Sequence, residues 1–199
     1  MAAETTQIKG SIFLNNVEFR LVPFQGEAVH PQTKCAFYVN NGHGGVIGVR
    51  VYPNGQKRLV NPDKVNWSGK HGKDVYLQFR YAFGIHKGIL ASHAVYLAWC
   101  RDIPAGMTID HINGCTTDNR FENLRCVTNA VNNRDGGFLR KLKKAGFNPK
   151  LIDRAYLLRY FDRMAKVREM LPYKAYRDLT KAQLRTFLYH PEFNINSFI

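Results

Sequence analysis

Apolar and polar residues alternate along much of the first ninety positions, and such alternation is typical of half-buried β-strands. Two pairs of alternating runs each enclose a short turn, and Asn54-Gly55 in the second turn tolerates positive φ. The runs are residues 11–14 and 17–22 around Asn15-Asn16, residues 46–52 and 56–60 around Pro53-Asn54-Gly55, and residues 74–81. The pattern therefore predicts an antiparallel β region over residues 1–90.

Helical spacing of apolar residues replaces this alternation later in the chain. Residues 92–100 are expected to form a helix that is capped by Ser92. Gly136-Gly137 is expected to end a helix that starts after Thr128, or to open a hinge there. Three further helices are predicted at residues 138–146, 150–171 and 181–189. Residues 137–199 are therefore predicted to be a helical C-terminal region.

Charge narrows the choice of partner. The chain has 199 residues, enough for one domain or two small ones, and a formal net charge of +14. A chain this basic usually meets a polyanion, and nucleic acid is the first expectation. Residues 134–199 hold fifteen lysines and arginines against six aspartates and glutamates, a net charge of +9. The C-terminal third is thus expected to contact phosphates, which gives affinity but little sequence readout.

Other sequence features argue against a membrane or secreted protein. No run of eighteen apolar residues occurs, and residues 1–6 lack the basic and apolar parts of a secretion signal. We therefore expect an intracellular protein without a membrane partner.

The cysteines form no Cys-x-x-Cys pair, which argues against a zinc knuckle and favours reduced thiols. Cys115 and Cys126 could face each other across a hairpin, and that bridge stays an open alternative.

The stretch from Asp110 to Asn133 is rich in Asp, His and Asn and poor in core-forming residues. It is predicted to run as a strand at residues 107–109, a polar loop, a strand at residues 124–127 and a helix capped by Thr128. The predicted local unit is therefore strand, loop, strand, helix.

The residue types in this unit suit hydrolysis with a metal ion. Asp110 offers a carboxylate oxygen and Asn132 an amide oxygen, and Mg²⁺ takes such ligands while keeping several waters. His111 titrates nearest to neutral pH, so its imidazole can accept a proton from water. The amide of Asn123 can bond the backbone of the loop or orient the imidazole.

The text "DHINGCTTDNRFENLRCVTNAVNN" resembles the HNH endonuclease motif of phage and group I intron nucleases. The resemblance implies a ββα-metal fold with one divalent metal ion, Mg²⁺ or Mn²⁺. It implies that Asp110 and Asn132 are the metal ligands, that His111 is the general base and that Asn123 is the structural asparagine of the catalytic set. Residues 92–99 resemble the helix usual before this motif, but Ala94 stands where the family commonly has arginine.

We predict an α+β fold with an N-terminal antiparallel β region, residues 1–90, a central ββα-metal nuclease core, residues 91–136, and basic C-terminal helices. The predicted activity is hydrolysis of DNA phosphodiester bonds, by nicking or double-strand cleavage, with no small-molecule cofactor and with monomer and homodimer both open. The predicted DNA contacts are Arg125, Arg134, Arg140, Lys141, Lys143 and Lys144. One alternative is an inactive DNA- or RNA-binding protein that keeps the scaffold. Another is a basic structural protein of an RNA assembly, which explains the charge but not the motif.

Overall fold

The computed structural model describes residues 10–69, 72–85, 88–100, 102–144 and 146. The chain divides into two compact units. The first is Met1–His111 with Cys115–Thr128, and the second is Ile112–Gly114 with Asn129–Ile199. The helices predicted at residues 150–171 and 181–189 lie outside the described residues, and the bounds of the three predicted domains stay predictions.

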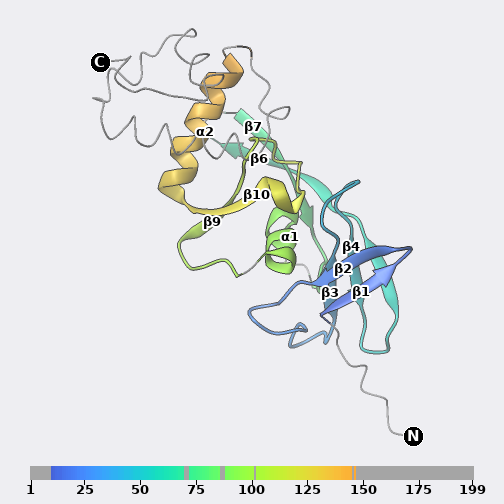
Figure 1. Cartoon of the computed structure of the whole chain (residues 1–199). Coiled ribbons are helices and arrows are strands. Elements are labelled where there is room, and N and C mark those ends of the chain that lie inside the picture. The colour runs from blue at the N-terminus through green and yellow to red at the C-terminus, as the bar shows by residue number, and fades with distance from the viewer. Residues whose placement is uncertain (1–9, 70–71, 86–87, 101, 145, 147–199) are drawn as a thin grey trace, which may run out of the picture. The chain divides into compact units, whose positions relative to one another are not determined.

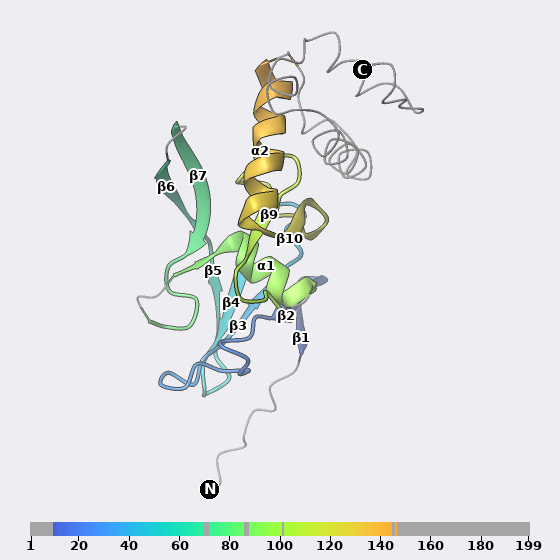
Figure 2. The ribbon, with the colours of Figure 1, turned by 90° about the vertical axis from the view of Figure 1, so that its left-hand side faces the viewer.

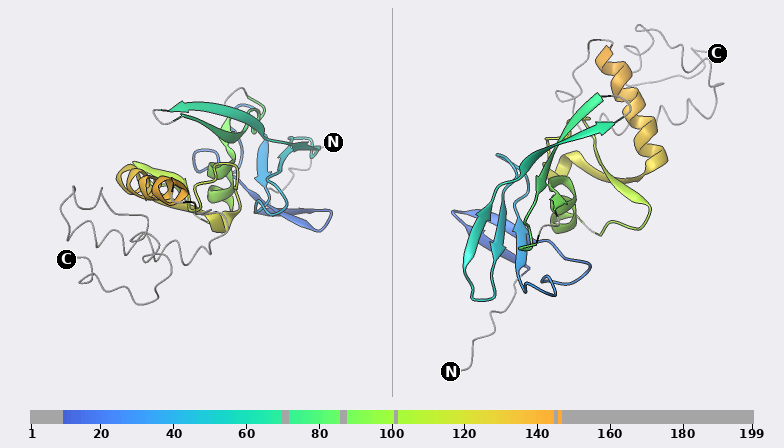
Figure 3. Two further views of the ribbon diagram at one scale, coloured as in Figure 1. Left: turned by 90° about the horizontal axis from the view of Figure 1, so that it is seen from above. Right: turned by 180° about the vertical axis from the view of Figure 1, so that it is seen from behind.

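The first unit begins with a five-stranded antiparallel sheet whose strands neighbour one another in chain order (Figures 1 and 3). Its strands are β1 (Ser11–Leu14), β2 (Val17–Leu21), β3 (Ala36–Val39), β4 (Gly48–Val51) and β5 (Lys57–Val60). Both predicted hairpins are confirmed. Asn15 and Asn16 have φ values of 48° and 63°, and Gly55 has 80°, as tight turns require.

The strand that the sequence pattern missed is β3. All four of its residues are buried, so neither face is polar and no alternation marks it. Phe37 and Val39 belong to the larger apolar cluster, whereas Ala36 and Tyr38 belong to a smaller cluster with Phe19. The strand therefore has an apolar cluster on each face, which explains why it carries no period-two signal.

A second sheet of the first unit contains β6 (Asp63–Gly69), β7 (Gly72–Phe79) and β8 (Ile89–Leu90). β6 and β7 pair along their whole length as a ribbon, seen at the left of Figure 2. The strand predicted at residues 74–81 is confirmed, with bounds two residues earlier at each end.

Helix α1 (Ala91–Trp99) follows β8 directly. The prediction that Ser92 caps it is wrong, because the cap position is Leu90 and no side chain bonds there. Ser92 is instead buried inside the first turn, with its hydroxyl 3.5 Å from Nδ1 of His93. The helix packs its buried residues Ala91, Ala94 and Val95 into the same apolar cluster as Phe37.

The last strands of the first unit form a two-stranded antiparallel sheet of β9 (Met107–His111) and β10 (Leu124–Thr128). The short 3₁₀-helix η1 (Phe121–Asn123) leads into β10. Both strands lie where the sequence predicted strands. α1 packs against β9, β10 and η1, so the apolar core supports the hairpin that carries the motif.

The second unit contains α2 (Asn129–Lys144), which starts directly after β10 as predicted. The break expected at Gly136-Gly137 is wrong, because the helix runs through both glycines. Each glycine costs roughly 1 kcal/mol in a helix relative to alanine. Ending the helix here and starting another would require a second unfavourable nucleation step. The guanidinium of Arg140 also lies back over the two glycines, 3.5 and 3.9 Å from where their Cβ atoms would stand.

The described residues thus form a mixed fold of antiparallel sheets and two α-helices. None of the helices in this part of the chain is long and apolar enough to cross a membrane. All four cysteines are free thiols, so Cys115 and Cys126 are not bridged.

Candidate active site

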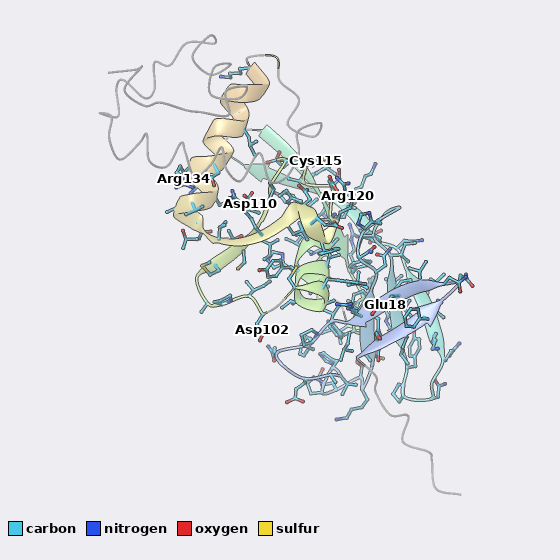
Figure 4. All side chains as sticks on the ribbon, in the orientation of Figure 1. Glu18, Asp102, Asp110, Cys115, Arg120 and Arg134 are labelled. Atoms are coloured by element: carbon cyan, nitrogen blue, oxygen red, sulfur yellow. The ribbon has the colours of Figure 1, made fainter. Side chains whose placement is uncertain are left out.

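The β9–β10 register sets the positions of the two residues that open the motif. Asp110 lies opposite Arg125, and His111 lies opposite Leu124. Neighbouring residues of a regular strand point to opposite faces, and β9 ends at His111. The imidazole therefore stands at the point where the chain leaves the sheet, and Figure 4 labels Asp110 just before it.

Hydrogen bonds fix the tautomer of His111. Its Nε2 lies 3.0 Å from Oδ1 of Asn119, and both residues are buried. Nδ2 of Asn119 donates to the carbonyl of Thr117 at 3.3 Å, and a carbonyl can only accept. The amide oxygen therefore faces the imidazole, and Nε2 of His111 carries the hydrogen. This arrangement leaves the lone pair on Nδ1, as a general base needs.

Burial lowers the pKa of His111 below its ordinary value of 6.5, although Asn119 and the carboxylates of Asp110 and Asp118 oppose the shift. Burial also lowers the pKa of His93 on α1, and the charge of His111 adds to that effect. Both imidazoles are therefore held neutral at physiological pH, the state in which His111 can accept a proton.

Tyr76 on β7 brings the β6–β7 ribbon to the motif. Its ring centroid lies 6.3 Å from that of His111. Burial raises the pKa of Tyr76, and the charges of Asp74 and Asp110 add to the rise. Thr116 of the motif loop also donates its hydroxyl hydrogen to the carbonyl of Val75 at 2.7 Å. The ribbon therefore contributes an aromatic wall beside the imidazole.

Asp110 forms a close ion pair across the hairpin. Nε and Nη2 of Arg125 lie 2.9 and 2.7 Å from Oδ2 of the carboxylate. The two side chains are only 14% and 12% exposed, so water screens this pair weakly. Arg125 was predicted to contact DNA, which stays a prediction, and the structure shows that it bonds the proposed metal ligand.

Asn123 bonds the backbone of the motif loop. Its Nδ2 donates to the carbonyl of Asp118 at 2.8 Å, across the turn that leads into η1. The carboxylate of Asp118 in turn accepts from Nε and Nη2 of Arg120 at 2.9 and 2.8 Å. Between the two roles that the sequence allowed for Asn123, this contact matches the bond to the loop backbone.

The glycine-rich loop at residues 40–45 supports the motif loop from the N-terminal sheet. The backbone N–H of Phe121 donates to the carbonyl of Asn41 at 3.1 Å. Nε2 of His43 lies 2.6 Å from a carboxylate oxygen of Glu122. A Cβ on Gly42 would stand 2.4 Å from the carbonyl oxygen of Asn119, so the two backbones are in direct contact.

The remaining predicted site residues lie on α2 in the second unit. Asn132 lies near the start of α2 and belongs to the second unit, whereas Asp110 belongs to the first. The role of Asn132 as a metal ligand stays a prediction. Nε of Arg134, which Figure 4 labels, lies 2.6 Å from Oδ1 of the buried Asp135. Arg140 and Lys144 are exposed. Lys141 and Lys143 are helical, but their side chains lie outside the described set.

The side-chain oxygens of the motif are of the kind that binds a divalent cation. Asp110 supplies a hard oxygen, and both bonds from Arg125 fall on Oδ2 rather than Oδ1. No group of three His, Cys, Asp or Glu side chains that could hold a metal occurs among the described residues. A site there would therefore depend on few protein ligands and keep several waters, as Mg²⁺ accepts. Arg125 competes for the same carboxylate.

Sequence reasoning missed two residues beside the imidazole. Asn119 lies eight positions after His111 in a loop that the sequence marked only as polar, and its neighbours Thr117 and Asp118 gave no reason to single it out. Tyr76 lies on an alternating strand that precedes the motif by more than thirty residues. Only the pairing of the ribbon with the motif loop reveals it.

Comparison with protein families identifies part of the chain. Residues 96–134 match the family model described as HNH endonuclease, which covers the end of α1, the β9–β10 hairpin and the first turns of α2. Searches with the chain found no significant match among curated proteins or among solved structures.

Proposed function

We propose, on the premise of the match of residues 96–134 to the HNH endonuclease family model, that the chain is a metal-dependent endonuclease that hydrolyses DNA phosphodiester bonds. The observation that carries the proposal is the pair of hydrogen bonds that fix Asn119 and leave Nδ1 of His111 as the acceptor. A protein that only binds nucleic acid has no need of an imidazole held neutral, in one tautomer, at the end of a strand.

In the proposed reaction, Nδ1 of His111 takes a proton from water, and that water attacks the phosphorus of the scissile bond. Asn119 keeps Nε2 protonated and holds the ring in place. Asp110 and Asn132 would hold one divalent ion, Mg²⁺ or Mn²⁺. When bound, that ion supplies positive charge that stabilises the leaving oxygen and the phosphate.

The charge distribution supports DNA as the substrate. The chain has a net charge of +14, and α2 carries exposed Arg140 and Lys144 after the motif. Lysines and arginines that neutralise phosphates give affinity without sequence readout. A single catalytic motif acts on one strand at a time, so we propose nicking as the basic activity.

A supercoiled plasmid assay tests this function. We expect wild-type protein with Mg²⁺ or Mn²⁺ to convert the plasmid to the open-circular form, and a chelator to stop the conversion. His111→Ala should lower the rate by about 10²–10⁴-fold, the range that a general base contributes, and should still bind DNA. Nicking that persists in His111→Ala, or in chelator, would refute the proposed mechanism.

A further inference from the structure

Two arginines face each other on β4 and β5, far along the chain from the motif. Arg50 and Arg58 are directly paired in the antiparallel register. Side chains paired in this way lie on the same face of a sheet, and like charges there destabilise it. An arrangement that places two guanidinium groups together therefore needs a compensating interaction.

Both arginines converge on one phenol. Nη1 of Arg50 donates to the hydroxyl of Tyr52 at 3.1 Å. Hydrogen bonds from Arg50 and also from Arg58 lower the pKa of Tyr52, and both positive charges add to that effect. A protonated phenol hydroxyl carries no charge, so in that state it orients the two cations without cancelling their charge.

The arginine pair has no acidic partner among the residues that the structure describes. Arg50 is only 7% exposed, and its Nε bonds the carbonyl of Ala82 at 3.2 Å. Neither Arg50 nor Arg58 takes part in any of the ion pairs found in the described ranges, whereas Arg80 nearby in the chain pairs with Asp63. Burying a cation without a counter-charge is costly. The pair is thus a built cationic site that lacks its anion.

We propose that Arg50, Arg58 and Tyr52 form a binding site for a backbone phosphate of DNA, separate from the residues of the motif. The proposal rests on the proposed function for its choice of DNA as the polyanion. A guanidinium presents parallel N–H groups that match two phosphate oxygens. Arg58 is exposed on β5, the edge strand of its sheet, so a duplex can approach it.

The test measures DNA binding of the full chain in chelator, by fluorescence anisotropy of a short duplex over a series of salt concentrations. The logarithm of the binding constant falls linearly with the logarithm of the salt concentration. Removing one phosphate contact should make this line less steep by about 0.9. We expect Arg58→Gln to show that loss and to weaken binding by about fivefold at moderate salt. Arg58→Lys keeps the charge and should keep the slope.

Arg80→Gln is the matched control, because it removes the same charge from an arginine that already has an acidic partner, Asp63. It should leave the slope unchanged. Tyr52→Phe should weaken binding less than Arg58→Gln, since it removes only the hydroxyl that orients the cations. Circular dichroism of each variant checks that the fold is retained.

The outcomes separate this site from the proposed function. If Arg58→Gln binds DNA with the wild-type slope while the wild type nicks plasmid, the phosphate site is wrong and the nuclease stands. If Arg58→Gln loses slope and the wild type never nicks, the site stands and the nuclease falls. A wild type that binds no DNA overturns the site as well.

Discussion

The five-stranded sheet and the motif loop between β9 and β10 are held by different forces. Phe37, Val39 and Val49 in the sheet are fully buried apolar residues. Asn119 and Asn123 in the loop are almost as buried, at 4% and 7% exposure, but they are held by directed hydrogen bonds. Apolar packing spreads over many contacts, whereas each loop bond orients one group. Changes in the sheet should therefore alter stability, and changes in the loop should alter chemistry.

The largest effect on stability is expected from Phe37→Ala. The ring is fully buried between Phe79 and Phe83, and such truncation costs about 3–5 kcal/mol. Urea unfolding followed by circular dichroism measures this loss. The nicking rate of the folded variant at low temperature should stay near that of the wild type.

Phe13→Ala is the control for this prediction, because Phe13 is 67% exposed on β1. It should change the free energy of unfolding by less than about 0.5 kcal/mol. A folded Phe37→Ala protein that has lost its nicking activity would contradict the division between sheet and loop.

Gly42→Ala should affect both properties, because Gly42 joins the sheet to the loop. Its φ is +84°, and a Cβ would stand 2.4 Å from the carbonyl oxygen of Asn119. Left-handed backbone alone costs an alanine roughly 1–2 kcal/mol, and the clash with backbone adds to that cost. We expect Gly42→Ala to lose more unfolding free energy than the backbone strain alone costs. We also expect a clear fall in its nicking rate, because Asn119 must shift.

Gly44→Ala separates strain from clash. Gly44 has a φ of +70° in the same loop, but a Cβ there meets no atom within 4 Å. This variant should show the backbone strain alone and should nick at the wild-type rate. Equal effects of the two substitutions on nicking would mean that the contact with Asn119 does not matter.

Asn119→Ala tests the bond that fixes the tautomer. It leaves the Nε2 hydrogen of His111 buried without its present acceptor, which costs about 1–3 kcal/mol. Loss of a group that orients a reacting side chain typically costs 10–100-fold in activity, and we expect a fall of about that size. ¹⁵N NMR of the imidazole should show a new population with the hydrogen on Nδ1.

Thr117→Ala is the matched variant for this test. It removes a hydroxyl but keeps the backbone carbonyl that accepts from Asn119. It should leave the tautomer and the nicking rate unchanged. An Asn119→Ala protein that keeps a pure Nε2-protonated imidazole would show that other groups set the tautomer.

Local signals explain what could be predicted from the sequence. Asn15-Asn16 and Asn54-Gly55 marked two hairpins because positive φ is a property of single residues. The short strands at β9 and β10 and the motif between them were also visible, because their residue types and spacing lie within one segment. The family match at residues 96–134 agrees with that segment.

Long-range contacts explain what could not be predicted. The contact between Gly42 and Asn119 joins residues seventy-seven positions apart, and no pattern in either segment encodes it. The ion pair of Asp110 with Arg125 depends on the register that a twelve-residue loop sets. β3 was missed because it is buried on both faces. These features arise only when separate segments pack together.

Arg125→Gln tests the electrostatic side of the motif. Its guanidinium bonds the carboxylate of Asp110 and should compete with a divalent ion for it. Removing that charge should tighten Mn²⁺ binding by about fivefold, because the guanidinium no longer competes for the carboxylate. Isothermal titration calorimetry measures the affinity. Arg120→Gln, which removes the ion pair with Asp118 instead, should have no such effect, and weaker Mn²⁺ binding in Arg125→Gln would mean that Arg125 positions the carboxylate.

Stability should also depend on pH in the absence of metal. Burial lowers the pKa of both His93 and His111, so the folded state binds fewer protons than the unfolded chain. Their contribution to stability is therefore complete above the ordinary histidine value of 6.5 and is lost as the pH falls below it. The slope for each histidine is at most about 1.4 kcal/mol per pH unit. Urea unfolding in chelator between pH 8 and pH 5 measures it, and His93→Gln should make the curve shallower. If His93→Gln leaves the dependence of stability on pH unchanged, that result would contradict the burial of the His93 imidazole. It would not bear on the hydrogen bond from His111 to Asn119, which Asn119→Ala tests.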